Sequence, residues 1–465
     1  MHNNVSCRRW FPGIFNVALL SASAWAVGCA AETGDGVGSA PPSVEGRLEL
    51  VMVGDGVTSH AEYFLSTSDR GDRWLRLDFS ARPELTGFHD TGNGEAHLHR
   101  PGGGTVRVQG DYLDPDTLSV TALDDIQLDD PDGAAAARGA LIAPTPRRVA
   151  VVLANFTDDP SQPVTQDAAR ALVFTAATST NAYYQEQSFG VRSLTGIQRA
   201  DGDVFGWFAI NASRTTCDYV GWGNLARAAA QSAGVNLAGY DQVIHYFPRS
   251  PSCGWAGVGQ LPGRYSWING STSSTIAHEL GHNFGVHHAS SLSCLDAAGA
   301  PVSISGSCTS SEYGDPYDVM GRGYRHMSAY QKGRLGFLEP VNTLTAPGAG
   351  TFTIAPLERK ATGVQVLRVP IRATSPQLYY YVELRQPSTF DAFAAGSPAI
   401  TGVLIHRNPD YAILARTQLI DAAPATSSFN DAPLPVGRTF TDSSAGIAIT
   451  LTALTSTGAT VQVSQ

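Results

Sequence analysis

The chain has 465 residues, a formal net charge of −10 and only 15% charged residues. This length exceeds what one hydrophobic core usually organises, so we expect two or three domains. The composition excludes a fibrous protein and wholesale disorder. The acidic balance disfavours nucleic acid and anionic membrane surfaces as partners.

The first 28 residues have the pattern of an export signal. A short basic start with Arg8 and Arg9 precedes an apolar stretch from Trp10 to Gly28. Proline, glycine and asparagine interrupt this stretch, which argues against a membrane-spanning helix. We therefore predict a signal peptide over residues 1–28 and an extracellular or cell-surface location.

Cys29 follows Ala26-Val27-Gly28, a sequence that resembles the lipoprotein box of bacteria. In that interpretation Cys29 is lipidated and becomes the new N-terminus of an outer-membrane lipoprotein, and this anchor is the only membrane contact we expect. The alternative is ordinary signal cleavage near Ala24-Trp25-Ala26, which would leave the protein fully secreted.

Residues 29–43 are rich in Gly, Ala, Ser and Pro and predict a flexible tether. Residues 44–130 hold short alternating runs such as 47–53 between Gly, Asp and Pro, which predicts a small β-domain. An acidic linker is expected over residues 131–147. Basic residues that a processing protease could recognise in or beside this linker are Arg138, Arg147 and Arg148.

From Arg148 the pattern changes to strands alternating with helices, which predicts an α+β (α/β) domain over residues 148–340. A continuous apolar strand is expected first, then two helices, a second strand and a final helix with Ser and Thr suited to capping in its first turn. These elements are predicted at Val149–Asn155, Thr165–Gln187, Asn224–Ala233, Asp241–Phe247 and Ser273–Phe284.

The last of these helices carries the segment HELGHNFGVHH, which begins at His278 and has the spacing HExxHxxGxxH. His278 and His282 lie one helical turn apart, so both imidazoles project from the same face and can bind one ion. Gly285 permits a positive φ that ends the helix and returns His288 toward the metal. The three histidines predict a Zn²⁺ site whose fourth position stays open for water.

Two further residues of this segment have expected roles. Glu279 is placed to take the proton of that water, which makes it the predicted catalytic base. His287 does not fit the ligand spacing, and we expect it to support the ligands or to lie at the surface.

The spacing HExxHxxGxxH resembles the zinc-binding signature of the metzincins, and this resemblance implies a methionine turn beneath the metal some tens of residues downstream. The segment Asp315–Gly321 contains proline and two aspartates, which favour a tight turn. Met320 within it supplies a soft side chain for the hydrophobic floor under the ligands.

The cysteines of the catalytic region predict two disulfides. Cys7 and Cys29 lie in the signal region, which leaves four cysteines further on, and an even number in an exported protein favours disulfides. Three pairings are possible. We prefer the two that close modest loops around the active-site segment, Cys217 with Cys253 and Cys294 with Cys308.

After Pro340 the sequence becomes rich in β-strand patterns separated by turn residues. A C-terminal β-sandwich over residues 341–465 fits this pattern.

The segments HELGHNFGVHH and YGDPYDVMG together resemble the gametolysin-like branch of the metzincins, secreted zinc endopeptidases first associated with cell-wall lysis in algae. The resemblance covers about residues 147–465, with the β-domain of residues 44–130 outside it. It is also carried by Arg148–Phe156, Tyr184–Gly190, Met327–Leu338 and Tyr379–Gln386.

The resemblance implies a metzincin-type catalytic domain, with residues 254–263 as the loop and edge strand along which substrate binds. Because the β-domain of residues 44–130 stands before this domain, it is most simply a prodomain. Trp255 and Trp267 either shape its subsites or pack in the interior. Where astacin- and serralysin-like enzymes carry a tyrosine two residues after the methionine, this chain has Arg322. Arg322, Tyr317 and Tyr324 are therefore candidates either for oxyanion stabilisation or for structural packing.

Latency through a zinc-bound prodomain thiolate is excluded, because no cysteine lies between Cys29 and Cys217. His97 and His99 could bind the metal instead, although alternation in a strand gives them an ordinary place.

Together these observations predict a monomeric zinc metalloendopeptidase that hydrolyses internal peptide bonds of extracellular or cell-wall proteins. The main alternative is a zinc-containing surface binding or adhesion protein with little or no peptidase activity. A zinc hydrolase acting on esters or other amides is a third option.

Overall fold

The computed structural model describes residues 42–71, 73–81, 104–121, 126–128, 146–270 and 272–465. The signal segment, Cys29, His97, His99 and Arg138 lie outside these ranges. Among the described residues, no helix combines the length and apolar character needed to cross a membrane. The fold is mixed and rich in β-sheet, with few helices.

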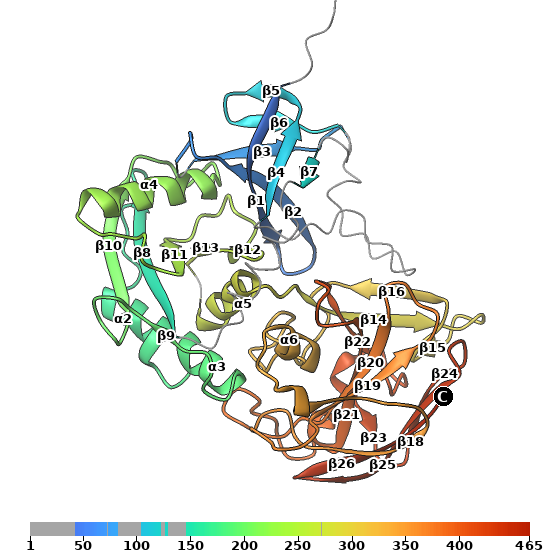
Figure 1. Cartoon of the computed structure of the whole chain (residues 1–465). Helices are drawn as coiled ribbons and strands as arrows, with labels where there is room; N and C mark the ends of the chain where they lie inside the picture. The colour runs from blue at the N-terminus through green and yellow to red at the C-terminus, as the bar shows by residue number, and fades with distance from the viewer. Residues whose placement is uncertain (1–41, 72, 82–103, 122–125, 129–145, 271) are drawn as a thin grey trace, which may run out of the picture. The chain divides into compact units, whose positions relative to one another are not determined.

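Thirteen strands of the described residues form one sheet, whose catalytic part runs in the order β10-β8-β11-β13-β12 (Figure 1). The first four of these strands are parallel, and β12 is antiparallel to β13. The strands are β8 (Arg147–Phe156), β9 (Leu194–Thr195), β10 (Asp203–Ile210), β11 (Gln242–Phe247), β12 (Gly257–Gln260) and β13 (Tyr265–Asn269).

Both faces of β8 are buried, which explains its unbroken apolar sequence. Val149, Val151 and Leu153 pack with the active-site helix on one face. The alternate residues of the strand, among them Val152, pack with α4 (Tyr219–Ser232) on the other face. The central strand therefore fixes the position of the active-site helix.

The N-terminal strands continue the same sheet. Strand β1 (Ser43–Gly54) pairs antiparallel with β12, so β12 is not an edge strand, in contrast to the expectation for residues 254–263. Beyond β1 the order is β2-β3-β6-β5, and β4 pairs with β1 and β7. These strands are β2 (Ser59–Ser66), β3 (Trp74–Asp78), β4 (Thr105–Gln109), β5 (Asp111–Asp114), β6 (Thr117–Ser119) and β7 (Ile126–Leu128).

The helix predicted over residues 165–187 is broken into three pieces: α2 (Gln166–Arg170), a π-helical turn η3 (Ala171–Thr175) and α3 (Thr180–Gln187). The break has a local cause, because the Ser179 hydroxyl accepts a hydrogen bond from the Ala182 N–H and starts a new helix. Helix α4 begins five residues earlier than predicted. Asp218 caps it by accepting from the Gly221 N–H.

A second sheet of nine strands crosses the boundary predicted at residue 340, because β14 joins strands of the C-terminal region. Its order is β15-β14-β22-β21-β20-β19-β17, with β16 on β14 and β23 on β21. The strands are β14 (Ala289–Leu295), β15 (Pro301–Val302), β16 (Ser307–Ser311), β17 (Thr343–Thr345), β19 (Val366–Ile371), β20 (Leu378–Glu383), β21 (Gly402–Pro409), β22 (Thr417–Ile420) and β23 (Leu434–Pro435).

A third sheet of four strands, in the order β18-β26-β25-β24, shares one hydrophobic cluster with the second sheet. The two sheets therefore pack against each other around a common core. The four strands are β18 (Gly350–Ile354), β24 (Thr439–Asp442), β25 (Ile447–Thr455) and β26 (Gly458–Ser464).

Both preferred disulfides are present. Cys217 is bonded to Cys253, and Cys294 is bonded to Cys308. The second disulfide joins β14 to β16 at a directly opposed pair of the ladder. It therefore fixes the register of the hairpin that follows the active-site segment.

Candidate metal centre

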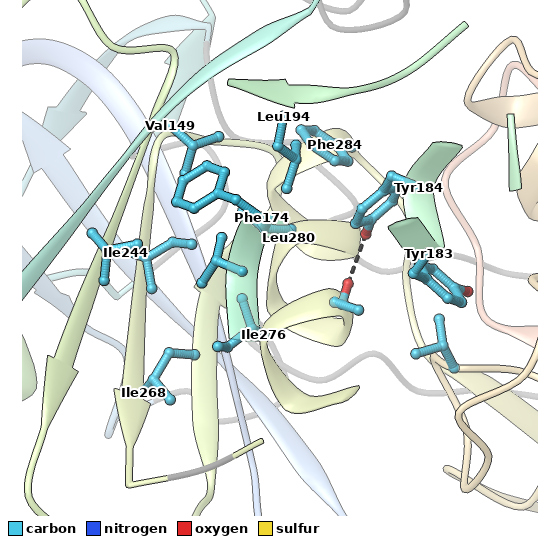
Figure 2. Packing of buried hydrophobic residues seen from close by; sticks show 14 of the residues in the cluster. Val149, Phe174, Tyr183, Tyr184, Leu194, Ile244, Ile268, Ile276, Leu280 and Phe284 are labelled. Carbon is cyan, nitrogen blue, oxygen red and sulfur yellow. Dashed lines mark hydrogen bonds between the residues drawn. The ribbon is translucent and has the colours of Figure 1, made fainter. Parts of the chain in front are cut away.

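Helix α5 (Ser273–Phe284) has the predicted bounds and is held by a large apolar cluster. Figure 2 shows Ile276, Leu280 and Phe284 of α5 packed among side chains of the sheet and of α3. The Tyr184 hydroxyl donates a hydrogen bond of 2.6 Å to the carbonyl oxygen of Ala277. The N-cap is Thr272, whose side chain makes no capping hydrogen bond, so packing rather than the expected capping holds this helix.

The chain brings the three predicted metal ligands together. Gly285 has φ 103° and ends α5, and its N–H donates to the Gly281 carbonyl at 3.1 Å. This left-handed residue returns the chain toward the helix, as the sequence predicted. One potential ligand atom each of His278, His282 and His288 lies within 4.8 Å of the others, and the Nε2 atoms of His282 and His288 are 3.0 Å apart.

The donor atoms of these histidines suit a metal ion. The Nδ1 atom of His278 lies 2.9 Å from the Val319 carbonyl, that of His282 lies 2.9 Å from the Val286 carbonyl, and that of His288 lies 2.7 Å from Glu312 Oε1. Each oxygen can only accept, so Nδ1 carries the proton and the Nε2 lone pair is left for a ligand. Three unprotonated Nε2 atoms gathered at one point are a metal-binding set.

Burial favours the neutral imidazoles that a metal requires. It lowers the pKa of His278 to about 4 and holds the pKa values of His282 and His288 well below their ordinary value. The charged form of a buried imidazole is disfavoured because it loses its hydration.

Glu279 lies in the same cavity as His278. This cavity has a volume of about 330 Å³ and is also lined by Gly257 of β12. Gly257 allows the strand to run directly against the carboxylate, since a Cβ there would lie 2.7 Å from Glu279 Oε1. Burial raises the pKa of Glu279 well above its ordinary value. A cation bound at the histidines would lower the pKa of Glu279, because a nearby positive charge favours the ionised carboxylate.

The predicted methionine turn lies beneath α5. A Cβ on Gly281 would lie 2.5 Å from Met320 Sδ, which shows how closely the thioether packs on the helix. The turn also positions one of the predicted metal ligands, because the Val319 carbonyl accepts a hydrogen bond from Nδ1 of His278. Asp318 stabilises the turn by accepting from the backbone N–H groups of Met320 and Ser328 at 2.8 and 2.7 Å.

The other residues singled out from the sequence divide between the cavity and the interior. Arg322 and Tyr324 line the cavity. His287 is buried, and its Nδ1 accepts from the His288 backbone N–H at 2.6 Å, so it supports the ligand segment rather than lying at the surface. Residues that pack in the interior instead are Tyr317, Trp255 and Trp267.

Two residues beside the ligands were not predicted. Glu312 accepts from His288 and also pairs with Arg416 at 3.0 Å. The ring of Tyr313 lies with its centroid 4.1 Å from that of His288, and this residue also lines the cavity. A signal for both existed in the disulfide. If Cys294 faces Cys308 in an antiparallel hairpin, Glu312 falls opposite Ser290, two residues from His288.

Glu312 should strengthen metal binding, because a carboxylate on Nδ1 fixes the tautomer of a histidine ligand and raises its basicity. We expect Glu312→Ala to raise the dissociation constant for Zn²⁺ about 10- to 100-fold. Glu312→Gln, which keeps an acceptor oxygen, should have a dissociation constant between those of the unchanged protein and of Glu312→Ala. Competition with a chromogenic chelator measures the constant, and the exposed Glu339→Gln is the control. Equal affinity in all four proteins would show that Glu312 does not position the ligand.

Residues 160–388 match the family model of the gametolysin peptidase M11. This part of the chain is a gametolysin-like peptidase domain. The matched region contains α5, the methionine turn and β20, and is shorter than the range of residues 147–465 over which we expected the resemblance. No curated protein matches the chain.

The match supports a metallopeptidase activity of this domain, with proteins as its substrates. A metallopeptidase requires a bound metal, and two groups of converging donor atoms within the match could hold one: His278 with His282 and His288, and His287 with His288 and Glu312. The first group has the ligand spacing predicted from the sequence.

Proposed function

We propose that the protein is an exported zinc metalloendopeptidase of the metzincin type. The observation that carries this proposal is the convergence of three Nε2 atoms beside the Glu279 carboxylate, in a gametolysin-like peptidase domain.

Zinc is the metal favoured by this donor set. Three neutral imidazole nitrogens without a thiolate or a further protein ligand are typical of catalytic rather than structural zinc sites. When bound, Zn²⁺ lowers the pKa of a water molecule to ~7 and polarises the scissile carbonyl.

The remaining chemistry belongs to residues of the chain. Glu279 accepts the proton of the attacking water and returns it to the departing amine. Its place beside β12 suits this role, because an extended peptide paired with that strand would pass the carboxylate with residues on both sides of the cleaved bond. This arrangement supports cleavage of internal bonds.

The proposal includes the surroundings of the enzyme. The N-terminal signal pattern supports export, with Cys29 as a lipid anchor, and the two disulfides suit an oxidising compartment. Extracellular or cell-wall proteins are the proposed substrates, and the β-strands of residues 44–130 are the proposed prodomain.

Arg147 and Arg148 are poor sites for the cleavage that activates the enzyme, because both lie in β8, where Arg147 is buried and Arg148 is bonded to Asp241. Cleavage is therefore expected earlier in the linker.

Metal removal tests the proposed reaction. We expect hydrolysis of casein or gelatin by the activated chain to disappear on treatment with a chelator and to return when one equivalent of Zn²⁺ is added. Metal content per chain is measured on the same samples. Hydrolysis that persists in metal-free protein would contradict the proposal. Zinc-loaded protein that binds polypeptides but cleaves none would instead support the surface-binding alternative.

A further inference from the structure

The outer edge of β12 is covered by a strand from the N-terminal region. Val51, Met52 and Val53 of β1 lie opposite Gln260, Gly259 and Val258 in an antiparallel ladder. The Leu261 N–H donates to the Leu50 carbonyl at 2.8 Å. The backbone groups with which a substrate strand would pair are therefore already used.

The turn between β1 and β2 reaches the catalytic cavity. Gly54, Asp55 and Gly56 line the same cavity as His278 and Glu279. Gly54 lies so close to the Tyr313 hydroxyl that a Cβ would be 1.9 Å from it. A residue with a side chain would not fit there without movement of the turn or of the tyrosine ring.

The first residue of β2 contacts the support of the metal ligands. The Ser59 hydroxyl donates to Glu312 Oε1, and its backbone N–H donates to Oε2 at 2.9 Å. The same hydroxyl oxygen lies 3.3 Å from His288 Nδ1. The turn thus lines the cavity, and the residue directly after it contacts the carboxylate that accepts from the third ligand.

The contact extends well beyond this turn. Val51, Phe64 and Trp74 share one buried hydrophobic cluster with residues of β11, β13 and α4. Polar groups join the same surfaces, because Gln260 donates to Glu49 at 2.8 Å and the Tyr219 hydroxyl donates to Glu62 at 2.6 Å. Hydrogen bonds and apolar burial of this extent do not depend on the covalent link between β7 and β8.

We propose that the strands β1 to β7 are a bound inhibitor which takes the place of the substrate strand on β12 and stays bound after the linker is cut. Activation then needs two steps, cleavage followed by dissociation. This inference rests on the proposed peptidase function.

The experiment uses the full chain with a recognition sequence for an added, specific protease placed within residues 131–145. Specific activity of the zinc-loaded protein is measured over a dilution series, before and after cutting. The uncut chain should show low activity that does not change with dilution, because its inhibitor is intramolecular. The cut chain should be equally inactive when concentrated and should gain activity on dilution, with the two pieces co-eluting from a sizing column only at high concentration.

The variant Gly54→Val tests the geometry without altering the catalytic residues. We expect the added side chain to weaken the contact with Tyr313, so that the cut variant becomes active at a concentration about 10- to 100-fold higher than the cut parent. The control Gly363→Val changes an exposed glycine with open space around it. It should leave unchanged the protein concentration at which the cut chain becomes active.

Two results would overturn the inference in distinguishable ways. Hydrolysis at one specific activity, independent of cutting and dilution, would confirm the peptidase and refute the inhibitor. Complete absence of hydrolysis from zinc-loaded protein whose pieces have separated would refute the peptidase, and the inhibitory role with it.

Discussion

Replacing Glu279 with glutamine should lower kcat/KM for peptide hydrolysis about 100- to 10,000-fold while zinc remains bound. Glutamine keeps the shape of the side chain but cannot accept a proton. Because burial disfavours a charge at this position, the neutral amide should be tolerated without loss of stability. The three imidazoles and their oxygen partners are untouched by the change.

The measurement combines steady-state kinetics of the cut and diluted chain with the zinc content of the same protein. Glu339→Gln is a matched control, since this carboxylate is exposed and forms a salt bridge with the exposed Lys360. Retained hydrolysis by Glu279→Gln would remove Glu279 from the reaction. Loss of zinc together with activity would show that the residue supports the metal site instead.

Arg385→Met should lower the free energy of unfolding by about 3–5 kcal/mol. Arg385 is fully buried and donates to Glu383 at 2.8 Å and to Asp391. Its second terminal nitrogen donates to the carbonyls of Tyr317 and His326, at 3.1 and 3.0 Å. Methionine would fill the volume but leave two buried carboxylates and two carbonyls without this donor.

The same change should reduce activity in the fraction that stays folded, because Tyr317 lies in the methionine turn and Val319 of that turn holds His278. Urea unfolding of the full chain measures the first effect, and kinetics well below the unfolding midpoint measure the second. Arg372→Met is the control, since Arg372 is exposed. A midpoint equal to that of the control would show that the buried charges are compensated by other groups.

The ligand helix was predictable because its information is local. The bounds of α5, the positive φ of Gly285 and the grouping of His278, His282 and His288 all follow from spacing along one short segment. The methionine turn and the disulfides were also found, since each rests on a few residues with strong preferences.

The surroundings of the ligands were not predictable in the same way. Ser59 and Glu312 are separated by 253 residues, and Arg385 binds a carbonyl 68 residues away. No periodicity in either segment indicates its partner. The prediction of an edge strand within residues 254–263 was wrong for the same reason. Strand β12 is the last strand of the catalytic part of the sheet, but β1, from a distant segment of the chain, pairs with it.

Strand β14 begins at the residue after His288. Its parallel neighbour β22 comes much later in the chain, after the last residue of the family match. At the other end of the family match, strand β8 lies between β10 and β11 in the sheet, but the whole strand comes before residue 160, where the match begins. A fragment trimmed to residues 160–388 would therefore lose β8, which joins β10 to β11 in one sheet, and both strands, β21 and β22, that join β14 to β20 in the other. The segment that matches the family model is a unit of recognition in sequence, whereas the unit to express, transfer or recombine runs from β8 to β26.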